Sequence, residues 1–421
     1  MLRNILSLGL QNGAVLIFLL LSSNTSNNSV MSIEAMILDE NDGVTAPADS
    51  ALAQGKTLSA DTRETLVHLL RKGIGENSLR ALRSDMAYIE AWSIACDGDY
   101  LVWPPDREIA LRFIAHHLWD PDKKAVDPSH GMPDYVRETL EAAGFLRSPG
   151  PHAPSTVKRR ISSWCAICAM RRVSHPFSEK EVYRILSAAV RASNRPRTPK
   201  SERLVDAVLL ERIIDRLTPY CSQEPFRDRE LDRTRLAALR DRAMLTLAFA
   251  AGGRRRSEVA AMTVGDLIAL KPIEANDPAW PEGLPMMAIS MGRTKTTNAE
   301  DALQVYVSGC AVQFVDEWLN AAGILAGPVF RPINKWGQIG VQAISGKSVN
   351  SILKSCLYEI GETPAEFSAH GLRAGYIVEA FRSGIPAPAI MEQTLHKSPA
   401  ILMSYFRDEE RKASPATRVF R

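Results

Sequence analysis

The sequence predicts a mainly helical chain of two domains, the second of which carries a small β-hairpin. Residues 76–191 place apolar side chains at three- and four-residue steps, which is the spacing of amphipathic helices. Residues 195–203 are rich in proline and basic side chains and contain no large apolar residue, as linkers do. Two short apolar runs, 286–291 and 303–307, flank a long polar segment and predict paired strands.

Length and composition fit two globular domains with ordinary cores. The chain has 421 residues, of which 45% are hydrophobic and 24% are charged. Its net charge of +3 favours no partner by itself, but the basic residues cluster. Such clusters suit a polyanion, and they are also typical of solvated surfaces. They lie at residues 158–160, 171–172, 195–203 and 254–256.

The six cysteines indicate neither a zinc site nor a disulfide framework. Only Cys165 and Cys168 lie close together, as CxxC within an apolar helical run, and no second pair with metal-ligand spacing follows. We therefore interpret the cysteines as reduced thiols of a cytoplasmic protein.

Residues 1–55 are expected to lie outside the fold, as a disordered or wrongly assigned leader. Met1 to Leu21 combines Arg3 with an apolar run that is similar to a secretory signal but too short and interrupted to predict a membrane span. Three hypotheses compete: a signal or anchor, a disordered tail, and a start assigned too early, with Met31 as the true start. We favour the third, because nothing downstream resembles a secreted protein.

The first domain, residues 56–194, is expected to be all helical with basic outer faces. A generic helical bundle and a DNA-gripping domain explain this segment equally well. Three helices are predicted over 76–96, after Pro104–Asp106 and from Pro133 to Gly144. A fourth follows a Ser155 cap and turns inward Val157, Ile161, Trp164 and Cys168. A fifth spans 179–191 after a Ser178 cap.

The second domain, residues 204–421, opens with an apolar helix over 204–217. A nearly all-apolar run over 243–251 predicts a fully buried helix, which Gly252 and Gly253 end. The three arginines at 254–256 follow directly. Their burial is costly unless an anion or a carboxylate meets them, and Glu258 can orient one of them.

The predicted strands flank a polar hairpin tip that carries Lys295. This lysine is either an ordinary solvated side chain or a mobile cation delivered to a phosphate. Helices are predicted next over 309–322 and 347–360, with Val329 and Phe330 as a short extended piece between them.

The end of the chain holds the densest set of reactive side chains. His370 and Arg373 stand three residues apart, so they share one face of a helix. Together they can bind one phosphate, because arginine offers a planar fork of donors and histidine a switchable one. His396 and Tyr405 follow, and a tyrosine hydroxyl beside that phosphate can attack it. Each residue alone is equally well explained by capping, surface exposure or core packing.

Taken together, the motifs resemble the tyrosine recombinase, or phage integrase, family, and within it the Cre-like branch. The family pattern Gly-x-Arg-x-Ser-Glu selects Arg255, with Glu258 as its acidic companion. The family commonly has a glycine where this chain has Leu395, and apolar residues where it has Arg254 and Arg256. The matching segments, in family order, are GGRRRSEVAAMTVGDL, MAISMGRTKTTNAEDALQVYV, HGLRAG and LHKSPAILMSYF.

The resemblance implies a fold, a reaction and a set of partners. The first domain would be a helical, SAM-like core-binding domain and the second an α+β catalytic domain, joined by the basic linker and clamping double-stranded DNA. No cofactor, metal ion or membrane is implied. A tetramer on two DNA sites is implied, with monomers or dimers off DNA, in a cytoplasmic, nucleoid-associated location.

The resemblance also assigns catalytic roles. Tyr405 would attack the scissile phosphate and form a 3′-phosphotyrosine link. Arg255 and Arg373 would hold the non-bridging oxygens, and His396 would donate a further hydrogen bond. His370 would accept the tyrosine proton, and Lys295 would protonate the departing 5′-oxygen.

Three rival hypotheses remain open. A type IB topoisomerase shares these residue types but relaxes supercoils without exchanging strands between duplexes. A non-catalytic DNA-binding regulator would keep the fold alone. A secreted or membrane-anchored helical protein depends wholly on residues 1–21. The helical first domain and the complete residue set favour a site-specific recombinase, acting in integration, excision or resolution of mobile or plasmid DNA.

Overall fold

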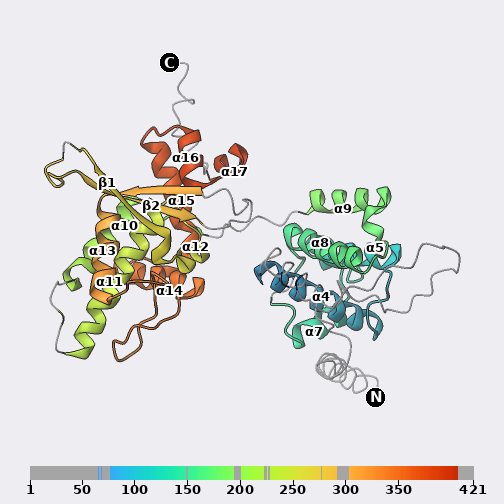
Figure 1. The fold of residues 1–421 in the computed structure, drawn as a ribbon. Coiled ribbons are helices and arrows are strands. Elements are labelled where there is room, and N and C mark those ends of the chain that lie inside the picture. The colour runs from blue at the N-terminus through green and yellow to red at the C-terminus, as the bar shows by residue number, and fades with distance from the viewer. Residues whose placement is uncertain are drawn as a thin grey trace. The chain divides into compact units, whose positions relative to one another are not determined.

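The computed structural model describes residues 76–405 apart from 148–149, 194–200, 222–224, 226–227, 276 and 292–302, together with residues 65 and 68. The chain divides into two compact units between residues 197 and 198 (Figure 1). Several predicted features lie outside the described residues: the leader at 1–55, the linker up to residue 200, the hairpin tip with Lys295 and the tail after Tyr405.

The first unit is helical in the part that the structure describes. Its main core gathers Trp92, Phe113 and Trp164, one each from α4, α5 and α8, and all three are fully buried. The short α6 was not predicted, because none of its residues is buried and its sequence therefore shows no apolar face. The elements are α4 (Glu76–Asp97), α5 (Arg107–His117), α6 (Pro121–Val126), α7 (Asp134–Ala142), α8 (Pro154–Met170), η1 (Pro176–Ser178) and α9 (Lys180–Ala192).

Two predicted helix caps in this unit are wrong. Ser155 is the second residue of α8, because Pro154 already begins that helix. Proline fits the first helical position, where its missing N–H needs no partner. Ser178 belongs to η1, and Glu179 precedes α9 instead. The predicted inward face of α8 is confirmed, since these side chains are all buried: Val157, Ile161, Trp164 and Cys168.

The second unit packs helices around a small sheet, with α11 at its centre. This helix contacts α10, α13, α14 and α15, which explains why its last part, residues 243–250, is almost entirely apolar. Prediction found only that buried part, since the first part carries a mixed surface. The helices are α10 (Ala207–Leu217), η2 (Thr218–Tyr220), α11 (Arg229–Ala250), α12 (Arg256–Ala261), η3 (Val264–Asp266), α13 (Cys310–Ala322), α14 (Gly346–Glu359), η4 (Pro364–Glu366), α15 (Ala369–Arg382), α16 (Ala387–Thr394) and α17 (Pro399–Met403).

The sheet is antiparallel, in the order β1 (Leu267–Ile273), β2 (Leu284–Met291) and β3 (Leu303–Ser308). The predicted pairing of β2 with β3 is confirmed, with Met287 opposite Val307. β1 was not predicted, because nearly all of its residues are exposed and leave no alternating pattern. In Figure 1, α13 covers the sheet, and it contacts both β2 and β3. No helix among the described residues is long and apolar enough to cross a membrane.

Two glycines let the end of α11 touch α15 and α16. Gly252 and Gly253 have left-handed φ angles of 88° and 66°. A Cβ atom on Gly253 would lie 2.2 Å from the Cα of Arg373, and one on Gly252 would lie 2.3 Å from the carbonyl oxygen of Gln393. Glycine is therefore required for backbone proximity as well as for conformation.

The turn after α16 uses the same left-handed conformation without a glycine. Leu395 caps α16 with φ 56° and ψ 42°. A residue with a Cβ loses roughly 1–2 kcal/mol in this conformation. The Leu395 side chain packs against the main core of the unit, and this contact offsets part of that loss. The left-handed turn after α16 is thus formed with leucine in place of the glycine that such helix ends usually have.

The Gly253→Ala substitution should destabilise the contact between α11 and α15. We expect the free energy of opening of α11, measured by hydrogen exchange of its buried amides in the full chain, to fall by more than about 2 kcal/mol. The matched control is Gly384→Ala, because Gly384 has a φ of 75° and no atom within 4 Å of its added Cβ. Equal losses in the two variants would contradict the close approach.

At position 395, glycine should be more stabilising than alanine. Both substitutions remove the leucine side chain, but only Leu395→Ala keeps the left-handed strain. Urea unfolding should therefore rank Leu395→Gly above Leu395→Ala by up to about 1 kcal/mol. Alanine is the better residue in right-handed helical backbone, so the reverse order would show that the turn is not left-handed.

Candidate active site

Tyr405 lies against both predicted histidines. The centroid of its ring is 5.6 Å from that of His370 and 5.6 Å from that of His396. Tyr405 also lies close enough to the guanidinium of Arg373 to raise the pKa of that group. Tyr405 follows α17 and packs, half-buried, against apolar side chains of α15 and α16. Four residues scattered over the end of the chain thus meet at one point.

Arg373 is the most deeply buried member of this cluster, with 2% of its surface exposed. Its Nη1 donates to the carbonyl oxygen of Gly253 at 3.3 Å, and its Nη2 donates to that of Thr394 at 2.5 Å. Burial lowers the pKa of Arg373 below its ordinary range, and the neighbouring Tyr405 opposes that shift. The guanidinium is therefore fixed mainly by neutral groups, and much of its charge remains available to an anion.

His396 is held on the other side of the same guanidinium. Nη2 of Arg373 lies 3.1 Å from Nε2 of His396, and Nδ1 of His396 lies 2.7 Å from the Thr394 hydroxyl oxygen. That hydroxyl donates its one hydrogen to the carbonyl of Ile390 at 2.6 Å, so it accepts from Nδ1–H. Neutral His396 therefore presents an unprotonated Nε2 toward Arg373.

Burial and surrounding positive charge keep His396 neutral. Burial is the larger cause, and the guanidinium groups of Arg373, Arg255 and Arg254 add to it, so the pKa of His396 falls to about 4. The site thus carries its positive charge on arginines and holds this imidazole neutral at neutral pH.

Arg255 and Glu258 form an exposed pair at the start of α12. Nη1 of Arg255 lies 2.5 Å from one carboxylate oxygen of Glu258, and the other oxygen accepts the backbone N–H of Arg255 at 3.1 Å. More than half of the Arg255 side chain, 57%, is exposed. Exposed ion pairs are worth at most about 1 kcal/mol, so Glu258 orients Arg255 without locking it away from an anion.

His370 lies in the first turn of α15, and its side chain is exposed. It stands one helical turn before Arg373, and the predicted shared face is consistent with both side chains reaching Tyr405. Lys295 lies outside the described residues, and so its predicted place in the site stays a prediction. The described strands β2 and β3 end and begin at Met291 and Leu303, on either side of its segment.

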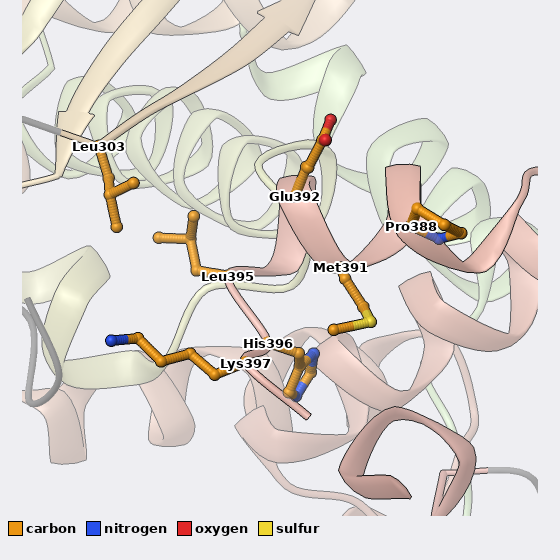
Figure 2. A pocket seen from close by; sticks show the side chains of 7 residues that line it. All are labelled: Leu303, Pro388, Met391, Glu392, Leu395, His396 and Lys397. Carbon is orange, nitrogen blue, oxygen red and sulfur yellow. The ribbon is translucent and has the colours of Figure 1, made fainter. Parts of the chain in front are cut away.

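A pocket of about 510 Å³ opens beside the His396 turn (Figure 2). Most of its wall comes from α16 and the residues after it, and Leu303 brings in the first residue of β3. Figure 2 shows the His396 ring at its edge, next to the Met391 side chain. The lining residues are Leu303, Pro388, Met391, Glu392, Leu395, His396 and Lys397.

The structure adds supporting residues that the motifs did not indicate. Thr394 fixes the tautomer of His396, and Gln393 donates to the carbonyl oxygens of Ala250 and Tyr306 at 3.0 Å and 2.7 Å. Both residues act through contacts between distant segments, which sequence spacing does not reveal. Gly253 carried a signal in the double glycine, although that signal indicated only the end of a helix. No group of three or more metal-binding side chains occurs among the residues described here.

Sequence comparison finds no matching family model but one clear relative. The chain is 33% identical over 177 residues to the integrase/recombinase xerD homolog of Selenomonas ruminantium, a match that covers 41% of this chain and 49% of that protein. The chain therefore spans about half the length of this curated relative.

Solved structures give weaker likenesses. The XerH site-specific recombinase bound to a difH substrate has a TM-score of 0.45 at 12% identity, over 87% of this chain and 86% of that one. A lambda integrase dimer bound to a COC′ core site has a TM-score of 0.41 at 12% identity, over 83% of this chain and 95% of that one. Scores below 0.5 carry no weight for function or assembly.

The relative from Selenomonas ruminantium is named an integrase/recombinase, and the present chain carries arginine, histidine and tyrosine motifs in the order typical of tyrosine recombinases. In these motifs and in this relative, the chain is similar to the tyrosine recombinase family.

Proposed function

We propose that this chain is a site-specific DNA recombinase that cleaves and rejoins strands through a 3′-phosphotyrosine intermediate. One observation carries the proposal: the ring of Tyr405 lies against those of His370 and His396, beside the buried guanidinium of Arg373. A nucleophile, a phosphate-binding cation and two proton-handling rings therefore share one small volume.

In the cleavage step, the Tyr405 hydroxyl oxygen attacks the scissile phosphorus as the bond from phosphorus to the 5′-oxygen breaks. A free tyrosine has a pKa of about 10, so its proton must leave during attack. His370 is the proposed acceptor, because its ring lies next to that of Tyr405. Lys295 is the proposed donor to the departing 5′-oxygen.

Arg255 and Arg373 are the proposed ligands of the non-bridging oxygens. Their donors would offset the negative charge of the pentacovalent transition state, and Arg373 is already fixed by carbonyl groups before the substrate arrives. His396 can add a donor only by gaining a second proton, because its Nδ1–H is bonded to Thr394. A bound phosphate would favour that proton, since a neighbouring negative charge raises the pKa of an imidazole.

The phosphotyrosine would conserve the energy of the broken bond, so religation needs no nucleotide cofactor. A 5′-hydroxyl from a partner duplex would then attack the phosphotyrosine and release Tyr405. Two such rounds would pass through a Holliday junction in a tetramer on two DNA sites. We propose that residues 56–194 grip double-stranded DNA, that 195–203 form the linker and that 204–421 form the catalytic domain, in a cytoplasmic, nucleoid-associated protein.

The most direct test is to trap the covalent intermediate. The full chain would be incubated with nicked duplexes from its own genomic neighbourhood, and the adduct would be mapped by mass spectrometry. We expect the link on Tyr405 and on a 3′-phosphate. The Tyr405→Phe variant should form no adduct, because it lacks the attacking oxygen, while its DNA binding stays within about twofold.

The matched control is Tyr358→Phe, because Tyr358 is 73% exposed on α14. It should form the adduct at the wild-type rate. An adduct on another residue, or one that survives in Tyr405→Phe, would overturn the assignment. Relaxation of supercoils without exchange between two duplexes would instead identify the rival topoisomerase activity.

A further inference from the structure

Arg254 is the one arginine of the GGRRR run that is buried and has no role in the proposed chemistry. Only 2% of its surface is exposed, which places it among the largest fully buried side chains of the described residues. Its Nε atom has no hydrogen-bond partner within that part of the chain. Burying a guanidinium costs free energy, which hydrogen bonds or a nearby carboxylate must offset.

Arg254 holds the end of α16. Its Nη2 donates to the carbonyl oxygen of Gln393 at 2.7 Å, and its Nη1 lies 4.0 Å from the carboxylate of Glu258. Gly252 makes this possible, because a Cβ there would lie 2.3 Å from the same carbonyl oxygen. The side chain of Gln393 returns to the carbonyl of Ala250, at the end of α11. Two hydrogen bonds, one donated from each side, therefore join the end of α11 and the turn after it to the end of α16.

Two buried arginines thus hold two consecutive carbonyl groups. Arg254 donates to the carbonyl oxygen of Gln393 and Arg373 donates to that of Thr394, and both carbonyls belong to the last turn of α16. Carbonyls at the end of a helix lack partners within the helix, and that end carries partial negative charge. Arg254 therefore completes the C-terminus of the helix from which the chain turns, through Leu395, to His396.

We propose that Arg254 is a positioning residue for His396: its guanidinium fixes the end of α16 against the turn after α11, and its enclosed charge adds to the field that would receive the phosphate. This inference rests on the proposed function for its catalytic consequence. Its structural part, the effect of Arg254 on His396, stands independently of DNA.

The field at His396 has several sources that the test must separate. Burial comes first among the causes that lower the pKa of His396, and Arg254 contributes less than Arg373 and Arg255. Removing the Arg254 charge should therefore raise that pKa by a modest amount and leave it below 6.5, the value of a free histidine. The charged and titratable groups around His396 are Arg254, Arg255, Glu258, His370, Arg373, Lys397 and Tyr405.

The test uses two readouts on the full chain. The first is an NMR titration of the His396 ring nitrogens without DNA. The second is single-turnover cleavage, against pH, of the nicked duplex on which the wild type forms its adduct. Arg254→Met removes both the charge and the hydrogen bond to the Gln393 carbonyl, whereas Arg254→Lys keeps the charge alone. The matched control is Arg256→Met, because Arg256 is exposed two residues away.

We expect Arg254→Met to raise the pKa of His396 and to slow cleavage roughly tenfold to a hundredfold, with DNA binding unchanged. Arg254→Lys should keep a His396 pKa near that of the wild type and still cleave slowly, because an ammonium group cannot reproduce the planar donors. Arg256→Met should match the wild type in both readouts.

If Arg254→Lys cleaves at the wild-type rate, the hydrogen bond from Arg254 to the end of α16 does not position His396. If His396 titrates in Arg254→Met as it does in the wild type, the charge of Arg254 does not act on His396. If Arg254→Met fails to fold, slow cleavage by a folded Arg254→Lys with a wild-type His396 pKa still supports positioning through that hydrogen bond. If the wild type itself forms no adduct, the proposed function fails, whereas the two titrations still decide whether Arg254 acts on His396.

Discussion

The second unit depends on the burial of one positive charge at a junction of three segments. The guanidinium of Arg373 is enclosed between the turn after α11 and the end of α16, where it donates to the carbonyl groups of Gly253 and Thr394. Neutral carbonyls can hold a guanidinium in position without neutralising it. This arrangement requires α11, α15 and α16 to meet at backbone distance, and the left-handed glycines after α11 allow that approach.

The same junction explains the arrangement of charge around Tyr405. Arg254 and Arg373 are buried, whereas the Arg255 side chain is 57% exposed and pairs with the carboxylate of Glu258. The buried pair fixes the framework, and the exposed arginine remains free to close on a ligand. His396 stays neutral beside these charges, with its proton directed to Thr394. An arriving phosphate would meet a positive site in which most of the reorganisation is already complete.

Much of this fold could be predicted from sequence, since its long helices carry clear apolar faces. The faces of α4 and α8 and the buried last part of α11 follow from helical periodicity, and β2 and β3 from two short apolar runs. β1 and α6 could not be predicted, because most or all of their side chains face solvent. The motifs indicated the residues around Tyr405, but no local pattern showed that Arg254 and Arg373 grip adjacent carbonyls. Arg254 stands 139 residues before Gln393 and Arg373 stands 21 residues before Thr394, so the relation arises only when these segments pack.

The central claim is that Tyr405 attacks the same phosphate that Arg373 binds. It is tested most directly by a crystal structure of the full chain on a nicked duplex with orthovanadate in the nick. The account predicts vanadium bonded to the Tyr405 hydroxyl oxygen, with its equatorial oxygens against the guanidinium groups of Arg255 and Arg373 and against His396. Vanadate bonded to another side chain, or seated away from Arg373, would contradict the account.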